Sequence, residues 1–133
     1  MKEIQFYAII SAIAAAESLL ILTGILPPLS SYSIGQILFS FAQLAVVVRM
    51  GWSSAKLGLE KVAVKGAKIG LVFMANIAVF SLIGYLSGTA LLGVTVPSAV
   101  GLLLILLSMT IMNVITFAIF AVVGMSFALK LKK

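Results

Sequence analysis

Few residues of this chain are of the types that perform catalysis or bind metal ions. Its 133 residues include no Cys, no His and no Asp, and the carboxylates are Glu3, Glu17 and Glu60. Without Cys and His there is no thiol nucleophile, no zinc or haem ligand of those types, and no imidazole for acid–base catalysis. An enzyme acting on lipid would depend on Glu17, Tyr85 or hydroxyl groups, without a G-x-S-x-G element. We therefore expect a protein that is not an enzyme and has no metal or cofactor.

Glu17 is the ionisable residue that lies deep within an apolar run. Counted from Lys2, it is about 22 Å along a helix. An ionisable side chain at such a depth in a membrane span indicates a functional site. A carboxylate there requires a proton or a cation, so we expect Glu17 to be largely neutral and to donate a hydrogen bond to Gln36 or Asn113.

Other polar side chains recur at two depths of the apolar runs. Gln36, Tyr85 and Asn113 lie about 20–25 Å from the cation that flanks their own run, and Ser11, Gln43 and Asn76 about 9–14 Å. Hydrogen bonds between helices at these levels would each contribute about 0.6–2 kcal/mol. On the second run, Gln36, Ser40 and Gln43 form a polar stripe along one helix face, at positions i, i+4 and i+7. The candidate polar core is Glu17, Gln36, Gln43, Asn76, Tyr85 and Asn113.

The composition identifies the environment of these residues. Hydrophobic residues make up 63% of the chain and charged residues 9%, whereas soluble domains average about 45–50% and 25%. So few charges cannot cover the surface of a soluble domain, and the net charge of +6 leaves few cations away from the membrane to bind nucleic acid. The sequence predicts an all-α integral membrane protein and excludes the soluble, disordered and nucleic-acid-binding classes.

Four apolar runs predict a four-helix transmembrane bundle in a single domain, 1–133. At a rise of about 1.5 Å per residue, each run is long enough to cross, or nearly cross, a hydrocarbon core of about 30 Å. Pro27 and Pro28 end the first run, Pro97 follows the third, and the long fourth run is expected to tilt. Gly66-x-x-x-Gly70 and Gly84-x-x-x-Gly88 would permit close helix contact. The predicted spans are about 4–26, 30–48, 69–93 and 98–129.

A cleavable signal peptide is the alternative for the first run. Lys2 would supply its charged region, residues 4–13 its apolar region and Ala14-Ala15-Ala16 its cleavage site. The apolar run nevertheless continues from Leu19 to Leu26, which favours a membrane span.

The basic residues test the number of spans independently. With four spans, all nine fall on one side, and the connections 27–33 and 94–97 carry no charge. The positive-inside rule then places the N- and C-termini in the cytoplasm and the protein in the cell membrane.

Residues 49–68 form a basic cytoplasmic loop between the second and third spans. Lysines gather on one face of its latter part, which predicts a short amphipathic helix on the leaflet surface with Trp52 as an interfacial anchor. The simpler interpretation of these basic residues is that the loop only orients the protein in the membrane. The more specific interpretation is that they contact anionic lipid headgroups. The candidate headgroup contacts are Arg49, Trp52, Lys56, Lys61, Lys65 and Lys68.

Two functions from different classes fit these features. The first is a structural or accessory membrane subunit, or a homo-oligomeric bundle, held together by its buried polar layers. The second is a small proton- or cation-coupled transporter that uses Glu17. The run Ala12-Ile13-Ala14-Ala15-Ala16-Glu17-Ser18, with four spans and a short chain, resembles the small multidrug resistance transporters.

The resemblance covers about one helix and implies that Glu17 exchanges protons for a cationic substrate in an antiparallel dimer. The third span departs from that family, since it has Phe73, Phe80 and Tyr85 but no Trp. The strong charge bias also departs from what an inverted dimer favours. The structural function is therefore the first expectation, and the transporter is the alternative.

Overall fold

The computed structural model describes residues 3–29, 33–89, 91 and 98–131, and nearly all of this part of the chain is helical. Four long helices, α1 (Glu3–Leu22), α2 (Ile34–Ser53), α3 (Leu59–Ser87) and α4 (Ala99–Leu131), are joined by short connections, one of which contains a 3-10 turn, η2 (Ala55–Leu57). Each long helix is long and apolar enough to cross a membrane. The predicted all-helical class with four helices long and apolar enough to cross a membrane is thus confirmed for the described residues, and the helices indicate a membrane location.

The helix ends differ from the predicted spans mainly around the connections. The first helix ends at Leu22, before the two prolines, and the second begins at Ile34. Ser33 and Gln36 form a reciprocal capping box at that start, and this fixes where α2 can begin. α3 ends at Ser87 and is capped by Gly88, whose left-handed φ of +82° suits glycine, and α4 continues to Leu131. Part of the third connection falls outside the described residues.

The expected short amphipathic helix between the second and third spans is not a separate element. Residues 59–68 are the first turns of α3, which runs without a break from Leu59. The chain reverses instead at Gly58, whose φ of +93° is easily adopted only by glycine. With 29 residues, α3 is about 43 Å long and exceeds a hydrocarbon core by about 13 Å. That excess matches the length of the charged first turns, and the lysines at 61, 65 and 68 lie on a continuation of α3 and not on a helix of their own.

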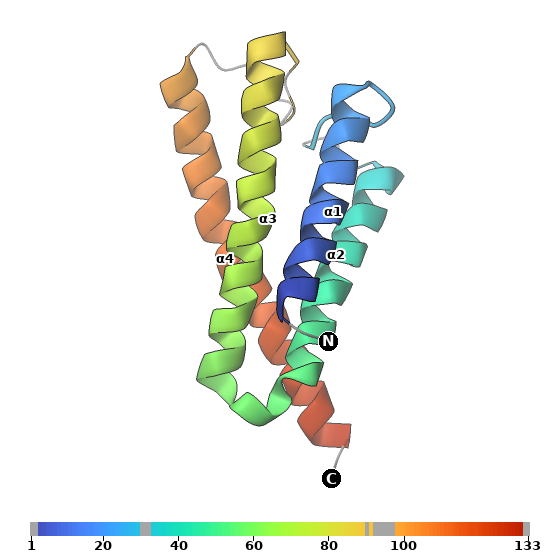
Figure 1. Ribbon diagram of the computed structural model, residues 1–133, viewed down its shortest axis with the longest axis vertical. Coiled ribbons are helices and arrows are strands. Elements are labelled where there is room, and N and C mark those ends of the chain that lie inside the picture. The colour runs from blue at the N-terminus through green and yellow to red at the C-terminus, as the bar shows by residue number, and fades with distance from the viewer. Residues whose placement is uncertain (1–2, 30–32, 90, 92–97, 132–133) are drawn as a thin grey trace.

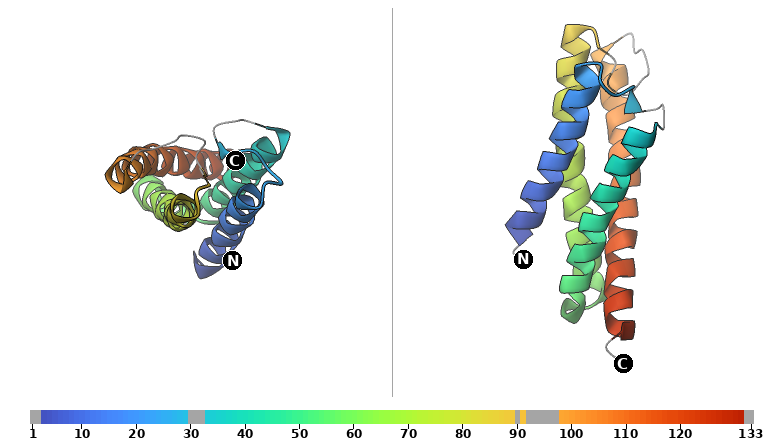
Figure 2. Two further views of the ribbon diagram at one scale, coloured as in Figure 1. Left: turned by 90° about the horizontal axis from the view of Figure 1, so that it is seen from above. Right: turned by 90° about the vertical axis from the view of Figure 1, so that its right-hand side faces the viewer.

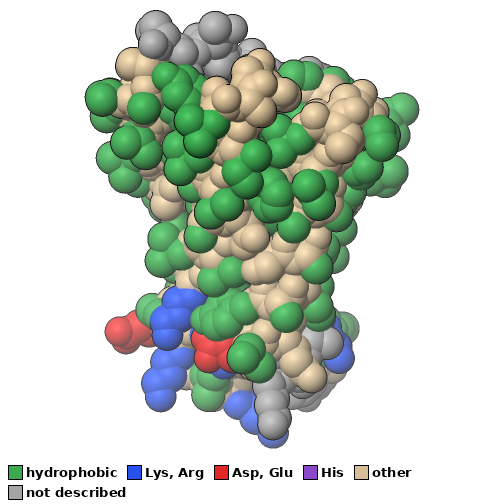
Figure 3. Space-filling view, turned by 45° about the horizontal axis from the view of Figure 1, so that its top comes forward, with side chains coloured by type: hydrophobic (Ala, Val, Ile, Leu, Met, Phe, Trp, Pro, Cys, Tyr) green, Lys and Arg blue, Asp and Glu red, His purple; other side chains and the backbone are tan. Residues whose placement is uncertain are grey.

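Consecutive helices run in opposite directions, so the start of α1 and the end of α4 point towards the same end of the bundle (Figure 1). Seen from above, the helices form a four-membered ring in which α2 lies beside α4 and α1 lies beside α3 (Figure 2). On the face shown in Figure 3, charged side chains gather at one end, and hydrophobic side chains are spread over the rest among backbone and other side chains.

Glycines bring three helix backbones into contact near the basic end. A Cβ atom added at Gly51 of α2 would lie 1.9 Å from the carbonyl oxygen of Ala121, and one at Gly124 of α4 would lie 2.1 Å from that of Val48. A Cβ atom added at Gly66 of α3 would likewise lie 2.6 Å from the carbonyl oxygen of Phe117 in α4. The Gly66-x-x-x-Gly70 pattern does mark close packing, and Gly51 and Gly124 add a second backbone contact.

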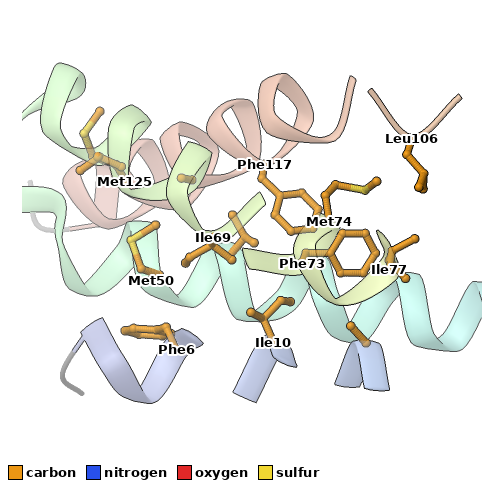
Figure 4. Close-up of a cluster of buried hydrophobic side chains, with 14 of the residues drawn as sticks. Phe6, Ile10, Met50, Ile69, Phe73, Met74, Ile77, Leu106, Phe117 and Met125 are labelled. Atoms are coloured by element: carbon orange, nitrogen blue, oxygen red, sulfur yellow. The ribbon is translucent and has the colours of Figure 1, made fainter. Parts of the chain in front are cut away.

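An apolar cluster surrounds these contacts and extends towards the middle of the bundle. Phe6 and Ile10 of α1 and Met50 of α2 are buried in one cluster with residues of α3 and α4 (Figure 4). The rings of Phe73 and Phe117 are 5.4 Å apart, within the range of favourable aromatic contacts. The basic half of the bundle is therefore tightly packed.

Gly51→Ala and Gly124→Ala should each destabilise the protein, because the added methyl group meets backbone that cannot rotate away. Overpacking of this kind costs about 1–3 kcal/mol, and we expect a lower midpoint of thermal unfolding in detergent or bilayers. Ala45→Val, which adds more volume on the exposed face of α2, is the control and should change the unfolding free energy by less than about 0.5 kcal/mol. Glycine variants as stable as the parent would show that the close α2–α4 contact is not formed.

Candidate functional site

A pocket of about 410 Å³ opens where α2 and α4 have separated, on the far side of the glycine contacts from the basic end. Residues 36–44 of α2 and Met109 and Asn113 of α4 form two of its walls. Glu17 of α1 and Phe73 and Ile77 of α3 complete it. All four long helices thus contribute to one cavity. Its described lining residues are Glu17, Leu29, Gln36, Ile37, Ser40, Phe41, Gln43, Leu44, Phe73, Ile77, Met109 and Asn113.

Glu17 reaches this pocket from the buried stripe of α1. Ile10, Ala14, Glu17 and Ile21 recur at helical spacing on the face that packs against the other helices. Only 3% of the surface of Glu17 is exposed. Its Oε1 atom accepts one hydrogen bond, from Nε2 of Gln43 at 3.2 Å. The sequence predicts that Glu17 bonds to Gln36 or Asn113, and that prediction is wrong: Gln43, the glutamine nearer the basic end, makes the contact.

Gln36 is engaged elsewhere because it lies in the first turn of α2. Its side-chain oxygen accepts from the backbone N–H of Ser33 at 2.8 Å, as the capping box requires. Its amide nitrogen donates to the carbonyl oxygens of Pro27 and Pro28, at 2.7 Å for Pro28. Gln36 therefore fixes the α1–α2 connection over one end of the pocket while it also lines the wall.

The other polar candidates separate into two groups. Asn113 lines the pocket, and its amide nitrogen donates to the Met109 carbonyl oxygen at 2.8 Å. Asn76 lies outside it and joins α3 to α1 by donating to Oγ of Ser11 at 3.1 Å. Tyr85, 37% exposed, is not part of the lining either. Of the six predicted polar-core residues, the pocket therefore brings together Glu17, Gln36, Gln43 and Asn113.

The chemistry of the pocket is that of one carboxyl group among amides and apolar side chains. Glu17 is the only titratable or charged residue among the described lining residues. Three amides, the Ser40 hydroxyl and the Phe41 and Phe73 rings share the cavity with it. Such a site can hold a proton on the carboxyl group, or a cation whose charge the carboxylate balances and whose apolar part contacts the aromatic rings.

Some lining residues were not identified from the sequence. The Gln36–Ser40–Gln43 stripe marks one wall, but Phe41 and Met109 belong to apolar runs in which nothing distinguishes them from lipid-facing neighbours. Leu29 lies in the connection after the two prolines, where the sequence gives no sign that it lines a pocket. Among the described residues, no group of three His, Cys, Asp or Glu side chains could hold a metal ion.

The predicted headgroup contacts lie at the other end of the molecule. Arg49 and Trp52 are in the last turns of α2, Lys56 is in η2, and the remaining three occupy the first turns of α3. Five of the six are exposed and Lys65 is half-buried. They form a polar end to the bundle, separate from the pocket.

Comparison with known protein families, with curated proteins and with solved structures finds no match to this chain.

Proposed function

We propose that this protein is a small proton-coupled carrier that binds an amphiphilic monovalent cation beside Glu17. The observation that carries the proposal is the pocket itself, in which a single buried carboxyl group with one hydrogen bond adjoins open volume. A carboxyl group with a purely structural role would be expected to have its polar atoms enclosed by partners. This one has room beside it for a ligand.

The charge balance of the pocket favours a cation that carries one positive charge. A buried carboxylate is strongly unfavourable unless it is paired, so the protonated acid is the stable form of the empty site. A bound cation stabilises the carboxylate, and the proton must then leave. The reaction is an exchange in which the acid releases H⁺ to water and the carboxylate pairs with the incoming ammonium group. Transport would follow if the site opened to each side of the membrane in turn.

A structural or accessory role, with the bundle alone or as a homo-oligomer, is the second candidate. It is favoured by the hydrogen bonds from Gln43 to Glu17 and from Asn76 to Ser11, which join α1 to α2 and to α3. In that case Glu17 would act only through its contact with Gln43.

Primary alkylamines provide a direct test in protein reconstituted in neutral-lipid bilayers. We expect decylamine to bind the parent protein and Glu17→Gln to weaken binding by about tenfold to a hundredfold, as expected for loss of a charge-assisted hydrogen bond. Binding should also weaken as pH falls, by up to about tenfold per unit, since the proton and the amine compete for one carboxyl group. Isothermal calorimetry measures both effects, and amine-driven proton release from loaded vesicles measures exchange.

Glu60→Gln is the matched control, because it removes an exposed carboxylate at the start of α3. It should bind decylamine like the parent. Absence of amine binding in the parent, together with lower thermal stability of Glu17→Gln, would contradict the carrier and support the structural role.

We further propose that the basic end faces the cytoplasm and contacts anionic lipid headgroups. The lysines at 61, 65 and 68 share one face of the α3 extension, which begins where the helix exceeds the hydrocarbon thickness. The indole of Trp52 and the exposed side chains of Leu57 and Leu59 lie close to them in sequence, as suits a segment at the membrane interface.

Replacing Lys61, Lys65 and Lys68 together with Gln should reduce the preference for anionic over neutral lipid. At about 1 kcal/mol for each lysine, the loss is about a hundredfold in relative affinity at low salt, and added salt should diminish the difference. The shift in the midpoint of thermal unfolding on adding phosphatidylglycerol to protein in neutral lipid measures this relative affinity. Lys130→Gln, at the end of α4, is a single-charge control, and a triple variant indistinguishable from it would contradict the contact.

A further inference from the structure

We infer that the ligand of the Glu17 pocket enters sideways from the bilayer, between α2 and α4, and is therefore a membrane-partitioning amine with a long apolar chain. The inference rests on the proposed function for the ligand's charge. The route itself follows from which sides of the pocket are closed and which is open.

The end of the pocket away from the basic residues is covered by a connection. Leu29 lines the pocket, and its backbone N–H donates to the carbonyl oxygen of Leu91 at 3.0 Å. This bond ties the α1–α2 connection to the α3–α4 connection across the top of the bundle. The hydrogen bonds from Gln36 to Pro27 and Pro28 hold the same segment in place, so the described residues there obstruct a path from water.

The opposite end is closed by packing. α2 and α4 come into backbone contact at Gly51 and Gly124. Val47 and Met50 follow the lining residues of α2 towards its basic end, and both are fully buried in the apolar cluster; Met50 is labelled in Figure 4. No lining residue of the pocket comes from this region, and a ligand could not pass it without separating the helices.

The side between α2 and α4 is open. Ile37 and Phe41 line the pocket but are 43% and 67% exposed, and Ser40, also in the lining, is exposed as well. These positions continue an outward-facing apolar surface that includes Ile34 and Leu38. In a bilayer that surface contacts acyl chains. The mouth of the pocket therefore opens to lipid, at a depth that an amine with a long alkyl chain can reach and a small hydrophilic cation cannot.

Quenching of a single tryptophan by brominated lipid tests the route. In a Trp52→Phe background, Met109→Trp places the reporter at the pocket wall, where Met109 is half-buried. Leu104→Trp on the exposed face of α4 and Phe6→Trp in the packed half are the lipid-exposed and buried controls. We expect the lipid to quench the pocket reporter nearly as strongly as the exposed one, and to quench the buried one little.

The ligand should then close the mouth. Decylamine should remove most of the quenching at Met109→Trp and leave that at Leu104→Trp unchanged, whereas butylamine at equal concentration should have little effect. Adding Glu17→Gln should abolish the protection by decylamine without abolishing the quenching.

Two results would overturn parts of the account separately. Quenching of the pocket reporter by aqueous iodide but not by brominated lipid would refute the lateral entrance, and calorimetric binding of decylamine would still support the proposed function. Quenching by brominated lipid without protection by decylamine would leave the entrance standing and refute the amine as ligand.

Discussion

The backbone contact between α2 and α4 at Gly51 and Gly124 determines the shape of the bundle. Two helices that cross at a single close contact move apart as they run away from that contact, unless a third element holds them together. Here α3 packs on α4 through Gly66, and α1 packs on α3, so the packed half is built around one contact. The pocket occupies the half where α2 and α4 have diverged, and it exists because small residues confine the close approach to one end.

Glu17 lies in the part of the bundle where packing is incomplete, and its position makes the pocket chemically specific. Gln43 supplies one hydrogen bond, and no cation lies among the described lining residues. A carboxyl group in these surroundings is stable with a proton or with a bound cation, and both cannot occupy it together. In the proposed carrier, the same low polarity that makes the bare carboxylate unfavourable would couple ligand binding to proton release.

Much of the fold follows from composition and periodicity, whereas the site depends on details that local sequence does not contain. Four apolar runs separated by prolines, glycine and charge predict the four helices. Gln36 and Asn113 belong to the predicted polar level at the depth of Glu17, whereas Gln43 belongs to the level nearer the basic end. Which amide contacts the carboxyl group depends on how α2 begins, because the capping box and the two proline carbonyls engage Gln36 and leave Gln43. The sequence does not predict that residues 59–68 continue α3, because a basic amphipathic segment has the same residue pattern whether it lies along a membrane or extends a membrane-spanning helix. The roles of Gly51 and Gly124 depend on the tertiary crossing.

In the proposed carrier, Glu17 gives up its proton when an amine binds. Infrared difference spectroscopy of the reconstituted protein, with and without decylamine, observes the carboxyl group directly, and subtraction of the Glu17→Gln spectrum assigns the band. If the amine displaces the proton, the carbonyl band of the protonated carboxylic acid should disappear on addition of amine, and carboxylate bands should replace it. A protonated-acid band that persists while calorimetry shows the amine bound would contradict it.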